Sequence, residues 1–238
     1  MIRVYCDFDG TVCQQDIGEQ FFRDYVGARA QDAVDELVRG TITAQEWLKR
    51  ECDMLPSITK AGFESYIGKF SLDPFFASFV EFARQREIAV TILSDGLDLY
   101  IEYLLRRAGI SHIPFFANHV QFVESMGKSS LEVSFPFTDA ECASCCNCKR
   151  NHMLTQSDDE DTIVYAGDGF SDRCPVRFAD VVFAKRQLIP YCQKQNITYR
   201  SFHDFRDIQS HIEEILKRKR IRHRQEAAMA RRDVFMQG

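Results

Sequence analysis

The 238-residue sequence predicts an α/β fold: a Rossmann-like, mostly parallel sheet with helices on both faces, and a small helical cap inserted after the first strand. Two observations support this prediction. Short apolar runs alternate with helix-like segments along most of the chain, which is typical of strands joined by right-handed crossover helices. Three of these runs end in polar turns that contain glycine, at the edge of the sheet where such folds place their sites.

The first strand and the segment after it are the most distinct parts of this pattern. Residues 2–6 form an apolar run that stops abruptly at Asp7, which predicts a buried strand that ends in a loop. From residue 14 to residue 73 the pattern becomes helix-like, and we expect the stretch 14–73 to be a helical cap domain. Its expected helices are 19–25, 30–38 and 45–55.

Strands and helices alternate from residue 74 onward, and together with residues 1–13 they form the predicted catalytic core domain (1–13 and 74–238). The expected helices are 75–86, 97–108, 149–156, one after residue 184, and a last one from residue 204. The expected strands are 88–93, 113–117, 162–166 and 180–184. Alternating residues in 121–124 and 131–135 also predict an antiparallel hairpin.

The composition restricts the class of protein. With 45% hydrophobic and 27% charged residues, the chain is typical of ordinary soluble globular proteins. No apolar run approaches the roughly 18 to 20 residues that span a bilayer, and the N-terminus lacks a signal-peptide pattern, so we expect a cytoplasmic protein without a membrane partner. Nine cysteines, an odd number, argue against a disulfide framework and fit a reducing compartment.

Charge is distributed unevenly along the chain. From Lys217 onward eight Lys or Arg stand against two acidic residues, which makes this tail +6, and the chain total of −5 therefore leaves −11 for the rest. An acidic body does not suit a nucleic-acid groove, because phosphate contacts need clustered Lys and Arg, so we expect no nucleic-acid partner. We interpret the basic run 217–224 as the solvated end of a terminal helix, with binding to an anionic surface as the alternative. The oligomeric state is left open.

Carboxylates stand at the ends of two predicted strands. Asp7 and Asp9 leave the first strand and can face one small volume, and Asp168 follows the strand 162–166. Such a pair also occurs in ordinary solvated loops. If Asp7 attacks a phosphate monoester, two unit charges ~4 Å apart repel by about 4 kcal/mol at an effective dielectric near 20, so a divalent cation is required. Mg²⁺ suits the hard oxygens of Asp7, Asp168 and the main-chain carbonyl of Asp9.

Residues elsewhere along this edge could bind the phosphoryl group. Lys149 would supply a fixed positive charge. Ser94, with the backbone amides of Asp95 and Gly96, would donate hydrogen bonds to the phosphoryl oxygens as charge redistributes in the transition state. Each of these groups answers a need of the same reaction.

Two further carboxylates have predicted roles in the same site. Asp9, two residues from Asp7, is placed to protonate the leaving oxygen and later to deprotonate the attacking water. Asp172, one helical turn after Asp168, could bind the cation through water or hold Lys149. The residues thus predict hydrolysis through an aspartyl-phosphate intermediate.

In order and setting, these residues resemble the four signature motifs of haloacid dehalogenase phosphatases. The matching segments are Asp7-Phe8-Asp9-Gly10-Thr11-Val12, then Ser94, then Lys149, then Gly167-Asp168-Gly169-Phe170-Ser171-Asp172. The resemblance spans nearly the whole chain, and its first and last motifs are specific. It implies a Rossmann-like core with nucleophile Asp7, acid/base Asp9, phosphate ligands Ser94 and Lys149, and one Mg²⁺ at Asp7, Asp9 and Asp168.

The segment 14–73 looks like the cap of the phosphoserine phosphatase branch, and such caps select the substrate. Other stretches are similar to the methionine-salvage phosphatases that act on 2-hydroxy-3-keto-5-methylthiopentenyl-1-phosphate. These stretches are residues 93–98 and 117–119, the cysteine-rich part before Lys149, and residues 183–186. The chain departs from that family at Asp95, where the family has Gly, and at Gly169, which the family's last motif lacks. The resemblance implies a small phosphorylated metabolite as the partner.

Other functions remain open at the level of sequence. One fold and motif set serves many substrates, so a phosphatase for phosphoserine-like or phosphoamine substrates is an alternative. A phosphotransferase would use the same intermediate and pass the phosphoryl group to an alcohol in place of water. From a different class, the chain could be a catalytically silent redox or metal sensor, although none of its motifs is broken.

A group of cysteines precedes Lys149. Cys142, Cys145, Cys146 and Cys148 lie within seven residues, a density found in metal sites. We favour loop or buried thiols over structural zinc, because adjacent Cys145 and Cys146 make a tetrahedral site awkward. Oxidation of this group could displace Lys149 and silence an enzyme.

Residues of the predicted cap have two interpretations. Glu19 could meet a substrate amine, as a cap glutamate does in the phosphoserine branch, but we favour an exposed helix carboxylate. Phe21 and Phe22 are expected in the core of the cap. The remaining candidates, His119, His152 and His203, show no partner pattern that predicts catalysis.

Overall fold

The computed structural model describes residues 1–125, 127–139, 145–218 and 223–237. Its strands are β1 (Ile2–Cys6), β2 (Ala89–Leu97), β3 (Phe115–Ser125), β4 (Lys128–Ser134), β5 (Thr162–Gly167), β6 (Val181–Ala184) and β7 (Arg200–Ser201). Its helices are α1 (Ile17–Val26), α2 (Ala28–Arg39), α3 (Ala44–Met54), α4 (Lys60–Ile67), α5 (Phe76–Gln85), α6 (Asp98–Arg107), α7 (Lys149–Thr155), α8 (Leu188–Lys194), α9 (Phe205–Leu216) and α10 (Gln225–Gln237). Two short turns are η1 (Phe8–Val12) and η2 (Pro175–Arg177).

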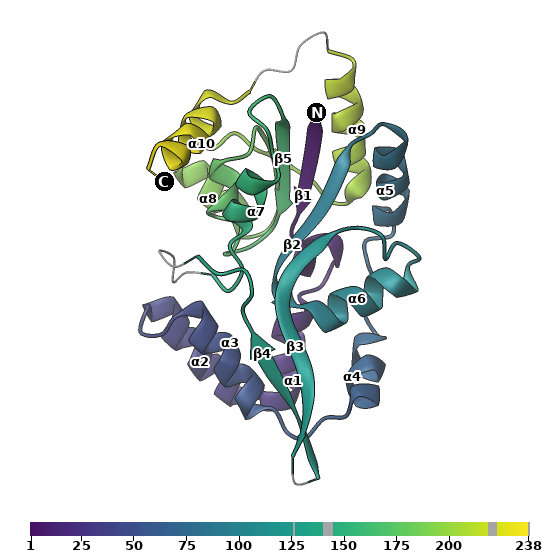
Figure 1. Cartoon of the computed structure of the whole chain (residues 1–238), viewed down its shortest axis with the longest axis vertical. Coiled ribbons are helices and arrows are strands. Elements are labelled where there is room, and N and C mark those ends of the chain that lie inside the picture. The colour runs from purple at the N-terminus through teal and green to yellow at the C-terminus, as the bar shows by residue number, and fades with distance from the viewer. Residues whose placement is uncertain (126, 140–144, 219–222, 238) are drawn as a thin grey trace.

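Seven strands form one sheet in the order β4-β3-β2-β1-β5-β6-β7, and neighbouring strands pair in parallel except β3 with β4. Helices flank both faces: α5, α6 and α9 lie on one side, and α7, α8 and α10 lie on the other (Figure 1). The predicted α/β fold with a mostly parallel sheet is therefore confirmed. Because β1 is central, the loop after it lies between the ends of β2 and β5.

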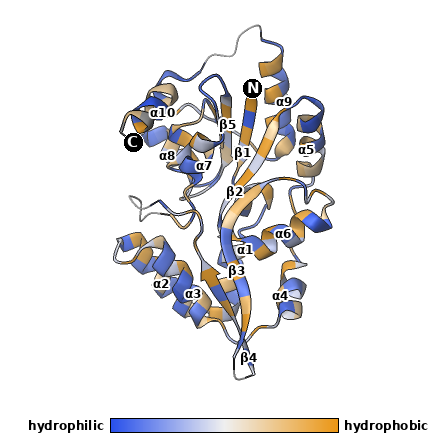
Figure 2. Ribbon diagram, viewed as in Figure 1, coloured by the Kyte–Doolittle hydropathy of each residue, from blue (hydrophilic) through white to orange (hydrophobic). Residues whose placement is uncertain are grey.

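Side chains of the central strands alternate between two apolar layers. On β1, Val4 and Cys6 join the layer that contains Phe205 of α9, whereas Tyr5 joins the layer that contains Met153 of α7. A strand that is buried on both faces requires this alternation. The central strands are accordingly rich in hydrophobic residues, and the helices turn hydrophilic residues outward (Figure 2). None of the helices in the described ranges is long and apolar enough to cross a membrane.

The second strand is longer than the sequence predicts. The apolar run 88–93 predicts a strand that ends in a turn at Ser94, but β2 continues through Leu97. Its pairing with β3 shifts register between Leu93 and Leu97. The backbone thus stays extended while residues 94–96 leave the regular ladder. The predicted turn is wrong, and an irregular strand end takes its place.

Four helices, α1 to α4, lie within residues 14–73, which we call the helical segment. The predicted helices 19–25, 30–38 and 45–55 correspond to α1, α2 and α3, whereas α4 was not predicted. Phe21 is at the centre of an aromatic core. Its ring contacts those of Phe22, Tyr25, Phe63 and Tyr66. That the helical segment is a separate cap domain stays a prediction.

The β3–β4 hairpin runs from the sheet to the helical segment (Figure 1). The predicted antiparallel pairing is confirmed, with Phe122 opposite Leu131. The ring of Phe63 on α4 lies 5.9 Å from the ring of Phe122, measured between centroids. The backbone N–H of Ile58 donates a hydrogen bond to the carbonyl of Ser129 over 3.3 Å. The far half of the hairpin therefore packs against the helical segment, and the predicted domain boundaries, which assign it to the core, stay a prediction.

The basic run does not extend a terminal helix as predicted. Helix α9 ends at Leu216, and the described residues 217–218 and 223–224 are not helical. The Arg224 guanidinium donates hydrogen bonds to the carbonyls of Val176 and Arg177, so the chain turns back onto the core before α10 begins. The prediction of a solvated helix end is therefore wrong for Arg224, which is anchored, whereas Lys217 and Arg218 directly follow α9 and are exposed as predicted. Residues 219–222 lie outside the described part.

Truncating the central ring of the helical segment is expected to destabilise the protein. Phe21 is 1% exposed and contacts four other rings, so Phe21→Ala should leave a cavity and lower the free energy of unfolding by about 3–5 kcal/mol. Chemical denaturation measures this loss. The matched control is Val38→Ala on α2, where Val38 is 77% exposed and the change should stay within about 0.5 kcal/mol. Equal losses for the two variants would contradict the described packing.

Candidate active site

Three strands of the sheet end at one place and carry acidic and hydroxyl side chains there. Asp7 directly follows β1, Asp168 directly follows β5, and Ser94 lies in the irregular end of β2. The backbone N–H of Asp7 donates to the carbonyl of Ala166 over 2.9 Å, which continues the pairing of β1 with β5 by one residue. The order of the strands therefore brings together residues that are 74 to 161 positions apart in the sequence, as predicted from the edge position.

Lys149, the first residue of α7, joins the site from one face of the sheet. Its Nζ lies 2.5 Å from Oδ1 of Asp7, 2.8 Å from Oδ1 of Asp172 and 2.9 Å from Oγ of Ser171. The side chain is only 1% exposed. Burial alone would lower the pKa of Lys149, but the adjacent Asp172 and Asp7 carboxylates raise it above its usual value. Lys149 is therefore a fixed cation between two acids.

Asp172 is fully buried and holds Lys149 in place. Its Oδ1 accepts hydrogen bonds from Lys149 and from the hydroxyl of Tyr165 at 2.6 Å, and its Oδ2 accepts from the amides of Asp168 and Gly169 at 2.8 and 2.9 Å. A Cβ on Gly167 would lie 2.5 Å from Cγ of Asp172, so the close approach requires glycine. Two roles were predicted for Asp172, to bind the cation through water or to hold Lys149. The structure contains the contact with Lys149.

Asp7, Asp168 and Asp172 form an acidic cluster in which one carboxylate oxygen from each lies within 4.8 Å of the others. Burial raises the pKa of Asp168 to about 6, Asp172 adds to the increase, and Arg186 at 3.1 Å opposes it. Burial also raises the pKa of Asp7, against the effect of Lys149. The three carboxylates of the acidic cluster therefore outnumber the two cations that contact them, Lys149 and Arg186.

The oxygens of the acidic cluster suit a hard divalent cation. The hydrogen bonds found among the described residues use Oδ1 of Asp7 and Oδ2 of Asp168, which leaves one oxygen of each for a metal ion. Asp172, by contrast, has both oxygens engaged. Mg²⁺ is commonly held by one or two carboxylates, water and a substrate phosphate, so this donor set fits it.

The carboxyl group of Asp9 is not part of the acidic cluster and is hydrogen-bonded to α1 and α6. Its Oδ1 accepts a hydrogen bond from the backbone N–H of Ile17 at 2.8 Å, and its Oδ2 accepts one from the hydroxyl of Tyr100 at 2.5 Å. Burial raises the pKa of Asp9 to about 7, and Asp16 contributes, while the two hydrogen bonds oppose the increase. Only the main-chain carbonyl of Asp9 is left for the predicted metal role, which stays a prediction.

The predicted phosphate-binding strand end is held by the loop before α7. The Asp95 carboxylate accepts from the backbone N–H of Asn147 at 2.9 Å, and Nδ2 of the fully buried Asn147 donates to the carbonyl of Ser94 at 2.9 Å. The N–H of Gly96 donates to Oγ of Ser94 over 3.0 Å. The Asp95 side chain therefore binds protein, and its predicted contribution to phosphate binding is limited to its backbone.

Three residues at this site were not identified from the sequence. Arg186 contacts Asp168 and donates to the carbonyl of Gln14 at 2.5 Å, with a left-handed backbone (φ 48°) that is unusual for arginine. Its position just after β6 is a pattern that could have indicated it. Asn147 and Tyr100 lie in a loop and on a helix face, where no sequence pattern distinguishes them from structural residues.

The cysteine group has three described members. Cys146 is fully buried, and Cys148 is buried as the N-cap of α7 with Sγ 3.7 Å from Oδ2 of Asp139. A contact with Cys145 lowers the pKa of the Cys148 thiol to about 7 despite burial. Cys142 lies outside the described residues, so the zinc alternative is untested.

Other predicted candidates lie away from the acidic cluster. Glu19 is exposed on α1 and pairs with Arg23 at 3.2 Å, in accord with the favoured interpretation of a helix carboxylate. Phe22, like Phe21, is buried in the helical segment as predicted. Nδ1 of His119 lies 2.6 Å from Asp98, and His203 is on the surface.

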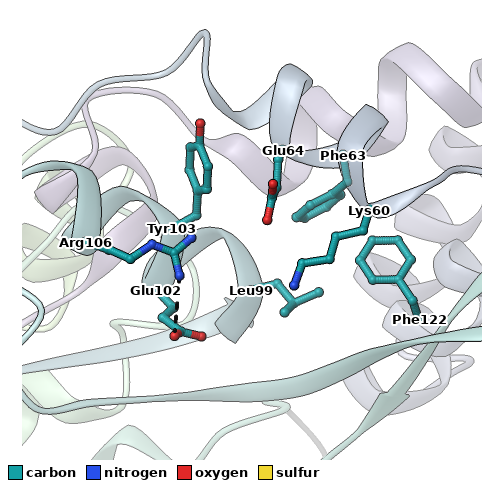
Figure 3. Close-up of a pocket in the computed structure, with 8 residues that line it drawn as sticks. All are labelled: Lys60, Phe63, Glu64, Leu99, Glu102, Tyr103, Arg106 and Phe122. Atoms are coloured by element: carbon teal, nitrogen blue, oxygen red, sulfur yellow. Dashed lines mark ion pairs between the residues drawn. The ribbon is translucent and has the colours of Figure 1, made fainter.

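A pocket lies elsewhere, between α4, α6 and β3 (Figure 3). It is lined by Lys60, Phe63, Glu64, Leu99, Glu102, Tyr103, Arg106 and Phe122. None of the predicted site residues lines it. The pocket thus marks the seam between the helical segment and the core.

Comparisons with known proteins agree with this geometry. Residues 2–215 match the family described as "Putative Phosphatase". The chain is 25% identical over 221 residues to the 2-hydroxy-3-keto-5-methylthiopentenyl-1-phosphate phosphatase of Bacillus cytotoxicus, covering 92% of this chain and 99% of that protein. It is 26% identical over 215 residues to the protein of the same name from Bacillus velezensis, covering 89% and 90%. The resemblance inferred from the motifs is confirmed.

Solved structures share the fold. A phosphoserine phosphatase solved as a phospho-aspartyl intermediate analogue aligns with a TM-score of 0.64 at 16% identity, over 88% of this chain and 98% of that one. A haloacid dehalogenase family hydrolase from Salmonella enterica serovar Typhi aligns with a TM-score of 0.68 at 16% identity, over 87% of this chain and 69% of that one. At this identity the likeness concerns the fold alone.

Protonation of His152 at low pH is expected to destabilise the folded protein at the loop that holds Ser94. Nε2 of His152 lies 2.7 Å from Oδ1 of Asn147, and burial lowers the pKa of His152 to about 4. The unfolded chain, with a usual pKa near 6.5, therefore binds the proton first, and stability is lost as the pH falls from about 6.5 to about 4. This loss should reach at most about 3 kcal/mol.

Denaturation curves at pH 7 and pH 4.5 test this expectation. His152→Gln, which keeps a donor for Asn147, should lose less stability between the two pH values than the native chain does. His203→Gln, at a side chain that is 89% exposed, is the matched control and should behave like the native chain. An identical pH dependence for all three proteins would show that His152 does not titrate as described.

Proposed function

Because the chain belongs to the family described as "Putative Phosphatase" and is a phosphatase of the haloacid dehalogenase type, we propose that Asp7 is its nucleophile. One observation carries this assignment: a buried lysine contacts Asp7 at 2.5 Å, within the acidic cluster formed with Asp168 and Asp172. Attack by a carboxylate on a phosphate dianion requires nearby cations, and the site concentrates groups that supply or bind them.

The first step transfers the phosphoryl group to Asp7. A carboxylate oxygen of Asp7 bonds to phosphorus while the bond from phosphorus to the ester oxygen breaks. Asp9 gives its proton to that leaving oxygen, so the alcohol departs neutral. The pKa of about 7 that burial gives Asp9 supports this role, since a carboxyl group with an ordinary pKa would hold no proton at neutral pH.

The second step hydrolyses the aspartyl-phosphate. Asp9, now a carboxylate, takes a proton from a water molecule as the water oxygen attacks phosphorus. The bond between phosphorus and the Asp7 oxygen breaks, which releases inorganic phosphate and restores the Asp7 carboxylate. Asp9 ends the cycle protonated, so no proton is left unaccounted for.

Lys149, Ser94 and two amides would hold the phosphoryl oxygens. Lys149 is already fixed by Asp172, so it need not reorganise when charge moves toward these oxygens. Oγ of Ser94 accepts from Gly96, which leaves the hydroxyl proton free to donate to a ligand. The amides of Asp95 and Gly96 complete the proposed set, for which the Gly96 N–H would have to leave Ser94 and turn to the ligand.

We propose that Asp7, Asp168 and the main-chain carbonyl of Asp9 hold one Mg²⁺. When bound, the ion offsets the negative charge of the cluster and of the substrate phosphate. The raised pKa values of Asp7 and Asp168 support this assignment: burial is their main cause, the neighbouring carboxylates add to it, and a bound cation would oppose both effects.

We propose that the helical segment is a cap that selects the substrate, and that the substrate belongs to the methionine-salvage class named in the relatives. The support for the cap is its contact with Asp9 through Ile17, at the start of α1. The support for the substrate is identity of 25–26% over almost the whole of those relatives. Cytoplasmic location and the lack of a nucleic-acid partner stay predictions.

Removing the Asp7 nucleophile is expected to abolish turnover. Asp7→Asn keeps the shape of the side chain but cannot form the acyl phosphate, so phosphate release should fall by at least about 10³-fold. Release is measured with a panel of small phosphate monoesters that includes the methionine-salvage compound, with Mg²⁺ and after chelation. Native activity should require Mg²⁺.

Asp53→Asn on α3 is the matched control, since Asp53 is exposed and pairs only with Lys49 among the described residues. It should keep native activity. Undiminished turnover by Asp7→Asn would remove Asp7 from the mechanism. A native protein that releases nothing from any monoester, while folded and supplied with Mg²⁺, would contradict the hydrolase assignment, and added acceptor alcohols would then test for phosphotransfer.

A further inference from the structure

Tyr100 of α6 reaches from the core into the acid/base position. The residue is 2% exposed, and its hydroxyl donates a hydrogen bond of 2.5 Å to Oδ2 of Asp9. Its ring lies beside that of Phe8, with centroids 5.9 Å apart, so the ring and the hydroxyl of Tyr100 both contact the segment that follows β1. A buried tyrosine hydroxyl needs such a partner, and here the partner is the proposed acid.

Asp9 is held by both of its oxygens. The Ile17 amide binds Oδ1 and the Tyr100 hydroxyl binds Oδ2, from different elements of the chain. Two hydrogen bonds on separate oxygens fix the rotation of the carboxyl plane, which one bond alone would not do. Each carboxylate oxygen has two acceptor positions, so the pair leaves room for a proton to reside on Asp9 or to pass to a ligand.

Gly96 makes the contact possible. A Cβ at residue 96 would lie 1.6 Å from the Tyr100 hydroxyl oxygen and 2.8 Å from Oδ2 of Asp9. A side chain there would displace the hydroxyl from Asp9. The strand end that is proposed to bind phosphate therefore also supplies the space in which Tyr100 meets Asp9.

The orientation of the Asp9 carboxyl group fits its proposed role as the acid that protonates the leaving oxygen. Asp9 is not among the residues of the acidic cluster, whose carboxylates face one another. It is instead bonded to the first residue of α1, on the side of the helical segment, where an alcohol leaving group would be covered by a cap. Without Tyr100 the carboxyl group would be free to rotate about its remaining bond.

We propose that Tyr100 is a positioning residue that aims the Asp9 carboxyl group at the leaving oxygen. The proposal rests on the proposed function of Asp9. In the first step the proton moves from Asp9 to the ester oxygen as the phosphorus–oxygen bond breaks, and Tyr100 keeps its own proton throughout. Tyr100 thus acts through Asp9 and touches neither phosphorus nor the metal ion.

The leaving group distinguishes this role from a structural one. An alkoxide leaves poorly without a proton, whereas 4-nitrophenolate leaves readily without one. A carboxyl group of Asp9 that is no longer correctly oriented should therefore reduce kcat/KM for an alkyl phosphate but leave kcat/KM for 4-nitrophenyl phosphate nearly unchanged. For Tyr100→Phe we expect a loss of about 10- to 100-fold with the alkyl ester, part of the 10²–10⁴ that general acid catalysis supplies, and less than about threefold with the aryl ester.

The experiment measures kcat/KM of both esters for native protein, Tyr100→Phe, Asp9→Asn and the double variant. Asp9→Asn should show the same selectivity with a larger loss, and adding Tyr100→Phe to it should cause no further loss. Tyr103→Phe is the matched control: it lies on the same helix but lines the seam pocket, and both esters should turn over at native rates (Figure 3). Circular dichroism confirms folding of each variant.

The outcomes separate this inference from the proposed function. Absence of turnover by the native protein would refute the function itself. Native turnover combined with equal effects of Tyr100→Phe on both esters, or with no effect on either, would overturn the positioning role alone. If Tyr100→Phe does not fold, the double variant is compared with Asp9→Asn. In the double variant residue 9 carries a neutral amide, so removal of the Tyr100 hydroxyl leaves no buried charge without a donor. A further loss of kcat/KM in the double variant also overturns the role.

Discussion

The arrangement of the whole site depends on one buried cation, Lys149, placed between Asp7 and Asp172. Each acid alone would be costly to bury in charged form, and so would the lysine. Removing one member of a buried ion pair typically costs about 3–5 kcal/mol, so the contacts must form together. Tyr165 and two amides complete the hydrogen bonding of Asp172, which makes it the fixed point from which Lys149 reaches Asp7.

The sheet provides the frame for this contact. Asp7 and Asp168 leave neighbouring parallel strands whose ladders are in register up to Cys6 and Ala166, so their separation is set by the spacing of the strands. Lys149 arrives at the start of α7, and Asn147 locks the preceding loop to β2. The proposed site is therefore built on strand ends and on a helix start that hydrogen bonds hold together.

Sequence reasoning located the residues that follow buried strands, because parallel strands end at a common edge. Asp7 and Asp168 were predicted in this way, and their proximity was confirmed. Tyr100 was missed because its importance arises from a contact across 91 positions, which no local periodicity records. Arg186 follows a strand, as the predicted site residues do, but its contact with Asp168 across 18 positions is not visible in the sequence. The end of the basic run differs from its prediction for a related reason: Arg224 looks solvated in sequence, but the carbonyls of Val176 and Arg177 accept its hydrogen bonds.

The β3–β4 hairpin sets limits on how relatives of this chain can diverge. Every second residue of β4, such as the buried Ser129 and Leu131, faces the helical segment. Each residue adds about 3.3 Å to the length of a strand. Removing two residues from each arm would bring the helical segment closer by about 7 Å with the same face inward, whereas removing one would turn polar side chains into the seam. A change in the length of this hairpin therefore keeps the same residues facing the helical segment only when residues are gained or lost in pairs.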